Sequence, residues 1–136
     1  MRTFSFLVFL IGSICMCVSC KTNVEDGYVM YINTIDCISC TDGIIYKIST
    51  PEFNQKLREN NVTVVFPDMR EVEQKKTLKD YSVDGMNVIF SDEKMEYYKK
   101  LSGTNISAIL KIKSGEVKEA TELRYLNHRK YEFNLE

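Results

Sequence analysis

The fold is decided by residues 28–40, which read YVMYINTIDCISC. Residues 28–33 are almost entirely aromatic, aliphatic or β-branched, and they predict a buried or half-buried strand. That strand leads directly into Cys37 and Cys40, which are separated by two residues. Apolar residues then recur at three- and four-residue spacing up to Ser49, which indicates a helix. The stretch therefore predicts a strand, a C-x-x-C pair and a helix in immediate succession.

Segments typical of strands and helices continue to alternate after this stretch. Asp68 and Glu71 are spaced as an N-terminal helix cap, while Ser91 and Gly103 are expected to begin and end a later helix. We expect further strands over 62–66, 86–90, 106–113 and 116–120, and further helices beginning near residues 50, 68, 91 and 121. Strands separated by helices are usually parallel, and two strands joined by a short Ser-Gly turn are antiparallel. The predicted class is α/β, with a mixed sheet, helices on both faces and a C-terminal antiparallel hairpin.

Composition limits the class of protein. The chain has 136 residues, 44% hydrophobic and 27% charged, which suits one globular domain with a short appendage. Lys and Arg number 18 against 19 Asp and Glu, so the formal net charge is −1. A protein without a basic surplus is not expected to bind nucleic acid by its overall charge. We also expect no cofactor and no bound metal.

The N-terminal segment has the layout of an export signal. Arg2 precedes an apolar stretch over residues 4–18, and charged and polar residues follow from Lys21. A run of that length is shorter than the roughly 20 residues that a membrane-spanning helix needs. The arrangement therefore favours an export signal over a permanent span.

Val18-Ser19-Cys20-Lys21 resembles the bacterial lipobox, in which a small residue precedes a cysteine that is acylated and becomes the new N-terminus. The resemblance implies a lipoprotein signal peptide over 1–19, a lipid anchor and short tether over 20–27, and a domain over 28–136. Cys20 is then the lipidated residue, and the domain lies outside the cytoplasm in a bacterial cell envelope. A signal cut elsewhere and an uncleaved anchor are the alternatives.

The order of elements resembles the thioredoxin superfamily, and in particular its exported, membrane-tethered thiol oxidoreductases and its redoxin branch. The resemblance is carried by a strand running into Cys37-Ile38-Ser39-Cys40, by Val62–Phe66 followed by Pro-Asp, by Met86–Phe90 followed by Ser-Asp-Glu, and by a final strand and Ser-Gly turn. It implies a thioredoxin-like three-layer sandwich that exchanges thiols and disulfides with another exported protein.

Two positions depart from that family. Asp36 stands where an aromatic residue usually precedes the first cysteine, and Ile106-Ser107 stands where the family has a cis-proline. In the family this proline lies against the active-site pair and guides the substrate backbone. Asp36 and Ser107 are therefore candidate modulators of the site.

The cysteine pair has a chemistry of its own. Cys37 at the start of a helix would be stabilised as a thiolate by unpaired backbone N–H groups and by the helix dipole. Cys40, three residues later, lies on the same helical face and can close a disulfide with Cys37. Cys37 is thus the expected nucleophile and Cys40 the resolving cysteine, whereas the adjacent Asp36 carboxylate disfavours the thiolate.

Three other interpretations remain open for this region. The pair could form an inert disulfide. It could bind a soft ion such as Cu(I), an interpretation that is helped if Asp42-Gly43 makes the region a loop. Finally, Thr34 and Cys37 form a T-x-x-C sequence similar to that of peroxiredoxins, whose threonine hydroxyl helps to position peroxide.

Overall fold

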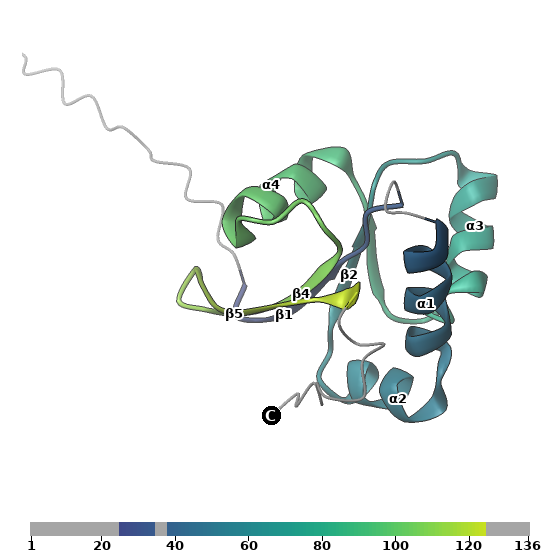
Figure 1. Ribbon diagram of the computed structural model, residues 1–136, viewed down its shortest axis with the longest axis horizontal. Helices are drawn as coiled ribbons and strands as arrows, with labels where there is room; N and C mark the ends of the chain where they lie inside the picture. The colour runs from purple at the N-terminus through teal and green to yellow at the C-terminus, as the bar shows by residue number, and fades with distance from the viewer. Residues whose placement is uncertain (1–24, 35–37, 125–136) are drawn as a thin grey trace, which may run out of the picture.

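The computed structural model describes residues 25–34 and 38–124. Strands and helices alternate through these residues (Figure 1). Their order is β1 (Gly27–Tyr31), α1 (Ile38–Ser49), α2 (Pro51–Glu59), β2 (Thr63–Phe66), α3 (Glu71–Asp80), β3 (Asn87–Phe90), α4 (Asp92–Ser102), β4 (Ala108–Lys113) and β5 (Glu116–Glu122). The predicted alternation is confirmed, with most boundaries within two residues of those expected.

The strands form one mixed sheet in the order β3-β2-β1-β4-β5. Strands β1, β2 and β3 are parallel, and Val64 of β2 pairs with Met30 on one side and Val88 on the other. Strand β4 runs antiparallel to β1, and β5 runs antiparallel to β4. The α/β class, the mixed sheet and the C-terminal antiparallel hairpin are therefore confirmed.

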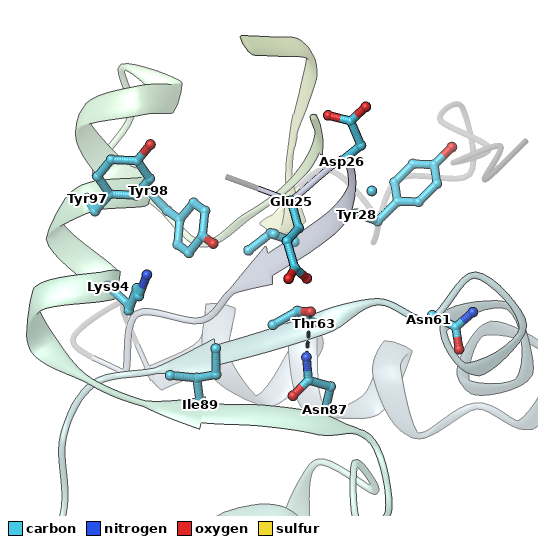
Figure 2. A pocket seen from close by; sticks show the side chains of 12 residues that line it. Glu25, Asp26, Tyr28, Asn61, Thr63, Asn87, Ile89, Lys94, Tyr97 and Tyr98 are labelled. Atoms are coloured by element: carbon cyan, nitrogen blue, oxygen red, sulfur yellow. Dashed lines mark hydrogen bonds between the residues drawn. The ribbon is translucent and has the colours of Figure 1, made fainter. Parts of the chain in front are cut away.

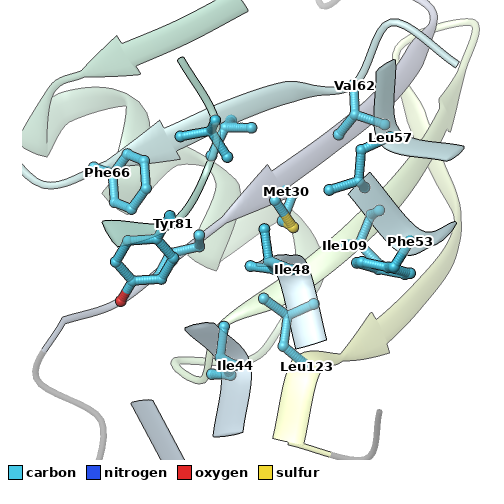
Figure 3. Packing of buried hydrophobic residues seen from close by; sticks show 13 residues of the cluster. Met30, Ile44, Ile48, Phe53, Leu57, Val62, Phe66, Tyr81, Ile109 and Leu123 are labelled. Atoms are coloured by element: carbon cyan, nitrogen blue, oxygen red, sulfur yellow. The ribbon is translucent and has the colours of Figure 1, made fainter. Parts of the chain in front are cut away.

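Helices α1, α2 and α3 cover one face of the sheet (Figure 1). The regular spacing of apolar residues in α1 and α2 turns one stripe of each helix towards the strands. Figure 3 shows how these side chains meet those of the sheet and form a continuous apolar layer. The fully or nearly fully buried members include Met30, Ile44, Ile48, Phe53, Leu57, Val64, Phe66, Tyr81 and Ile109.

Helix α4 lies on the opposite face (Figure 1). Successive residues of a strand point to opposite faces, so Val29 and Tyr31 face α4 while Met30 faces α1. Met95 and Tyr98 of α4 are buried against this second face. With a helix layer on each side of the sheet, the predicted arrangement of helices on both faces is confirmed.

Both ends of α4 form as predicted. The Ser91 side chain accepts a hydrogen bond of 3.2 Å from the backbone N–H of Lys94. Gly103 ends the helix with a φ of 72°, a left-handed conformation that glycine adopts without strain.

The predicted cap of α3 is wrong. The helix begins at Glu71 with Arg70 as its N-cap, and Glu73 accepts a hydrogen bond from the Arg70 backbone N–H at 3.1 Å. Asp68 instead accepts from the backbone N–H of Met69, and its own N–H donates to Asp92. The Asp68 side chain is therefore engaged in the loop, two residues before the actual cap.

The prediction that a final helix starts at Thr121 is also wrong. Thr121 and Glu122 belong to β5, where they pair with Ile109 and Ala108 of β4. The backbone ladder of the hairpin extends over these two residues and excludes a helix there. Leu123 and Arg124 begin a 3₁₀ turn, and the residues from 125 onward lie outside the described residues.

None of the helices in the described ranges is long and apolar enough to span a membrane.

Candidate functional site

The residues singled out by the sequence converge on one end of the sheet. Strand β1 finishes there at Tyr31, and β4 starts there at Ala108, which pairs with Tyr31 in the antiparallel register. Asn33 and Thr34 follow β1, while Ser107 directly precedes β4. The carboxyl end of β1 and the amino end of β4 therefore lie side by side.

A buried serine fastens these two segments together. The backbone N–H of Asn33 donates a hydrogen bond of 2.7 Å to Ser107 Oγ, and the Asn33 side-chain amide donates to the Asn105 carbonyl at 3.1 Å. Ser107 is fully buried. We call this pair of hydrogen bonds the Asn33–Ser107 contact; it holds the segment that leads to the cysteine pair against the segment that precedes β4.

The structure describes only part of the predicted site. Thr34 is exposed at the end of the sheet just described, and Cys40 is the third residue of α1. Cys37, whose neighbour Ile38 is the first residue of α1, lies outside the described residues, as do Asp36 and the predicted lipidation site Cys20. The fold thus brings to the same end of the sheet Thr34, Ser107 and the start of α1.

The first turn of α1 differs in charge from those of its neighbours. Helix α3 begins with Glu71 and Glu73, and α4 begins with Asp92 and Glu93, so these carboxylates offset the positive ends of the helix dipoles. The first turn of α1 contains Cys40 and no acidic residue. Within that turn, the partial positive charge of the α1 N-terminus is not offset by a carboxylate.

The loop at Asp42-Gly43 that would help the metal interpretation is absent. Asp42 and Gly43 lie inside α1, which runs without interruption from Ile38 to Ser49. In the described ranges, no three His, Cys, Asp or Glu side chains gather closely enough to hold a metal ion. The helix therefore removes the support that a loop over Asp42-Gly43 would give to the soft-metal interpretation, while Cys37 lies outside the described residues.

A groove of about 520 Å³ lies at the opposite end of the parallel strands (Figure 2). We call it the α4 groove. The amino-terminal parts of β1, β2 and β3 form its floor and one wall, and Lys94, Tyr97 and Tyr98 of α4 form the other wall. Asn87 and Thr63 are joined across the floor by a hydrogen bond of 2.9 Å.

Burial and charge act on the tyrosines of this groove. The Tyr97 and Tyr98 rings meet edge to face, with their centroids 5.3 Å apart. Burial raises the pKa of the Tyr98 hydroxyl, and Tyr97 and the Glu25 carboxylate raise it further. Tyr98 therefore stays protonated throughout the physiological range and can donate a hydrogen bond.

Sequence patterns did not reveal the α4 groove or the Asn33–Ser107 contact. Tyr28 and the Tyr97-Tyr98 pair are interpreted from sequence as core or rim aromatics, which describes their packing but not the groove between them. The groove is assembled from three stretches that are distant in sequence, over residues 25–29, 61–63 and 87–98, and no local spacing connects them. Asn33 at the end of a strand is equally uninformative until its partner Ser107 is known.

Comparison with the models of known protein families, with curated protein sequences and with solved structures found no match for this chain.

Proposed function

We propose that the chain is an exported lipoprotein, anchored in a bacterial cell envelope through Cys20, whose thioredoxin-like domain exchanges thiols and disulfides through Cys37 and Cys40. The partner is another exported protein that carries a thiol pair or a disulfide.

The Asn33–Ser107 contact is the observation that carries this proposal. In the family that the sequence resembles, the residue before the hairpin lies against the cysteine pair. Here Ser107 directly precedes β4 and its hydroxyl holds Asn33, four residues before Cys37 in the sequence. The strand order, with β1 between β2 and β4, is compatible with the same arrangement.

The absence of an acidic residue from the first turn of α1 gives an electrostatic reason for reactivity. Thiolates are stabilised near the positive end of a helix, and the first turn of α1 has no acidic residue to weaken that effect. Asp36, next to Cys37 in the sequence, acts in the opposite direction because a carboxylate disfavours a neighbouring thiolate. We therefore expect a nucleophile of moderate acidity.

The exchange proceeds in two balanced steps. The Cys37 thiolate attacks one sulfur of the partner's disulfide; a mixed disulfide forms, and the other partner sulfur leaves as a thiolate. Cys40, as its thiolate, then attacks the Cys37 sulfur and releases the second partner sulfur. Two electrons pass to the partner, and the Cys37–Cys40 disulfide is formed.

Trapping of the mixed disulfide tests the assignment of roles. The full-length Cys40→Ser variant, incubated with glutathione disulfide, should retain glutathione on Cys37, since no resolving thiol remains. The matched Cys37→Ser variant should retain at least tenfold less, because Cys40 is the resolving and not the attacking thiol. Peptide mass spectrometry after alkylation identifies the modified cysteine.

Three results would contradict thiol exchange. Equal labelling of the two variants would remove the distinction between nucleophile and resolving cysteine. Absence of glutathione from both would indicate inert thiols. A wild-type pair that stays oxidised at about −350 mV would indicate a structural disulfide.

Lipidation is tested separately. In a bacterial host, the wild-type chain should be recovered with membranes and should carry diacylglycerol on Cys20. Cys20→Ser should abolish both, whereas Cys15→Ser should change neither because Cys15 follows Ile14 and not a small residue. Membrane attachment that survives Cys20→Ser would show that an uncleaved segment forms the anchor.

A further inference from the structure

We propose that the α4 groove binds a small zwitterion, a molecule that carries an ammonium group and an anionic group a few bonds apart. This site is distinct from the proposed cysteine site, because it lies at the amino ends of the parallel strands and not at their carboxyl ends.

Opposite charges line the two walls of the groove without neutralising each other. Lys94 lies on the α4 wall and Glu25 on the β1 wall, as Figure 2 shows. Both side chains are exposed, and within the described part of the chain neither forms an ion pair. A ligand that places an anion near Lys94 and an ammonium near Glu25 would complete both interactions.

A largely buried tyrosine also lines this space. Tyr98 is only 8% exposed, yet it lines the groove. Among the residues that the structure describes, none forms a hydrogen bond with its hydroxyl, and this oxygen is not sealed from solvent. A ligand in the groove can therefore accept a hydrogen bond from this hydroxyl.

The floor supplies a further acceptor in a fixed orientation. Asn87 uses its amide nitrogen to bond Thr63 at 2.9 Å, and this leaves its carbonyl oxygen available. Asp26 is held in place by a 2.6 Å hydrogen bond from the Ser114 backbone, which fixes the adjacent part of the β1 wall. Asn87 and Asp26 are therefore positioned before a ligand arrives.

The size and chemistry of the groove select the class of ligand. A volume of about 520 Å³ suits an amino acid, a short peptide or a phospholipid headgroup, and these share the ammonium and anion that the walls require. A simple anion would face the carboxylate of Glu25, and a simple cation would face Lys94. Only a molecule with both charges satisfies both walls.

Two sources can supply this chemistry. Glu25 is five residues beyond Cys20, and five extended residues span at most about 18 Å. If Cys20 carries the lipid anchor, the groove lies close to the membrane surface, where ethanolamine headgroups are zwitterionic. Free amino acids and peptides are the second source.

Titration of the isotopically labelled full-length chain, followed by NMR, tests the proposal. The probes are glycerophosphoethanolamine and alanyl-alanine as zwitterions, with glycerol 3-phosphate and ethanolamine as singly charged controls. At least one zwitterion should shift the Tyr97 and Tyr98 signals with an affinity at least fivefold above that of either control. The tighter of the two zwitterions identifies the headgroup or the peptide as the source.

Variants of α4 provide the matched control. Lys94→Gln and Tyr98→Phe should each weaken binding of the favoured zwitterion by roughly fivefold, through loss of a charge or a hydroxyl. Lys100→Gln, which changes an exposed lysine of the same helix outside the groove, should leave the affinity unchanged. Equal effects of Lys94→Gln and Lys100→Gln, equal affinity for all four probes, or no zwitterion binding below 10 mM would each overturn the proposal.

Discussion

Ser107 shows how one side chain can connect two segments that only the fold brings together. It is the single buried polar residue among those that the structure describes, and its hydroxyl accepts the Asn33 N–H at 2.7 Å. Asn33 is partly buried, where an N–H without an acceptor is costly, so this serine has a structural role whatever the chemistry of the cysteine pair.

Replacement of Ser107 by alanine is therefore expected to lower the free energy of unfolding by about 1 to 3 kcal/mol, because the Asn33 N–H loses its acceptor. Urea denaturation followed by circular dichroism measures the change. Thr34→Ala is the control at the same end of the sheet: Thr34 is exposed, and its loss should change stability by less than about 0.5 kcal/mol. Equal effects of the two substitutions would show that the Asn33–Ser107 contact contributes little.

At the scale of elements, α3 shows how hydrogen bonds on the surface can fix the first turn of a helix. None of its residues is fully buried. Glu73 accepts hydrogen bonds from the backbone and the side chain of Arg70, at 3.1 and 2.7 Å. The side-chain hydrogen bond from Arg70 is the largest cause that lowers the pKa of Glu73, followed by the backbone hydrogen bond from Arg70. The carboxylate thus helps to fix the first turn of the helix.

This lowered pKa predicts a pH-dependent contribution to stability. A carboxyl group whose pKa is lower in the folded state stabilises the fold above its unfolded pKa, and the contribution is lost as the pH falls through the folded pKa. Glu73→Gln should consequently lower the melting temperature at pH 7, and the difference from wild type should shrink as the pH drops below about 4.

Glu71→Gln is the matched control for this prediction. Glu71 lies in the same first turn but forms only an exposed ion pair with Lys75, at 2.8 Å. Its replacement should lower the melting temperature less than Glu73→Gln does, since exposed pairs of this kind contribute little. A difference between Glu73→Gln and wild type that persists unchanged at pH 3 would rule out the carboxylate as its cause.

The helices and strands also show what could be predicted from the sequence. Periodicity located the strands and helices because each buries one face, and Ser91 and Gly103 mark the ends of α4 through local geometry. The predictions for the cap of α3 and the end of β5 are wrong because both features depend on residues distant in sequence. The backbone N–H of Asp68 donates to the Asp92 carboxylate, and Thr121 pairs with Ile109. Local patterns contain no information on such partners, and the α4 groove was missed for the same reason.

The whole molecule is stabilised by two apolar layers. One lies between the sheet and the helices α1 to α3, and the other lies between the sheet and α4 (Figures 1 and 3). The central strands β1, β2 and β4 contribute to both, because alternate residues point to opposite faces. A core that extends over both faces does not require a covalent staple, and the cysteines are then available for chemistry.

This view of the core predicts how the folded chain responds to reduction. A Cys37–Cys40 disulfide closes a loop of only four residues, and the chain-entropy gain from such a short loop is about 2 kcal/mol. A reductant should therefore lower the melting temperature of the oxidised full-length chain by no more than about 10 °C and leave a cooperative transition. The Cys37→Ser/Cys40→Ser double variant should melt at the same temperature with and without reductant. Scanning calorimetry of both proteins makes the comparison. Loss of the cooperative transition on reduction of the wild type alone would mean that the disulfide holds the fold together, and a pair with that role could not cycle between thiol and disulfide as thiol exchange requires.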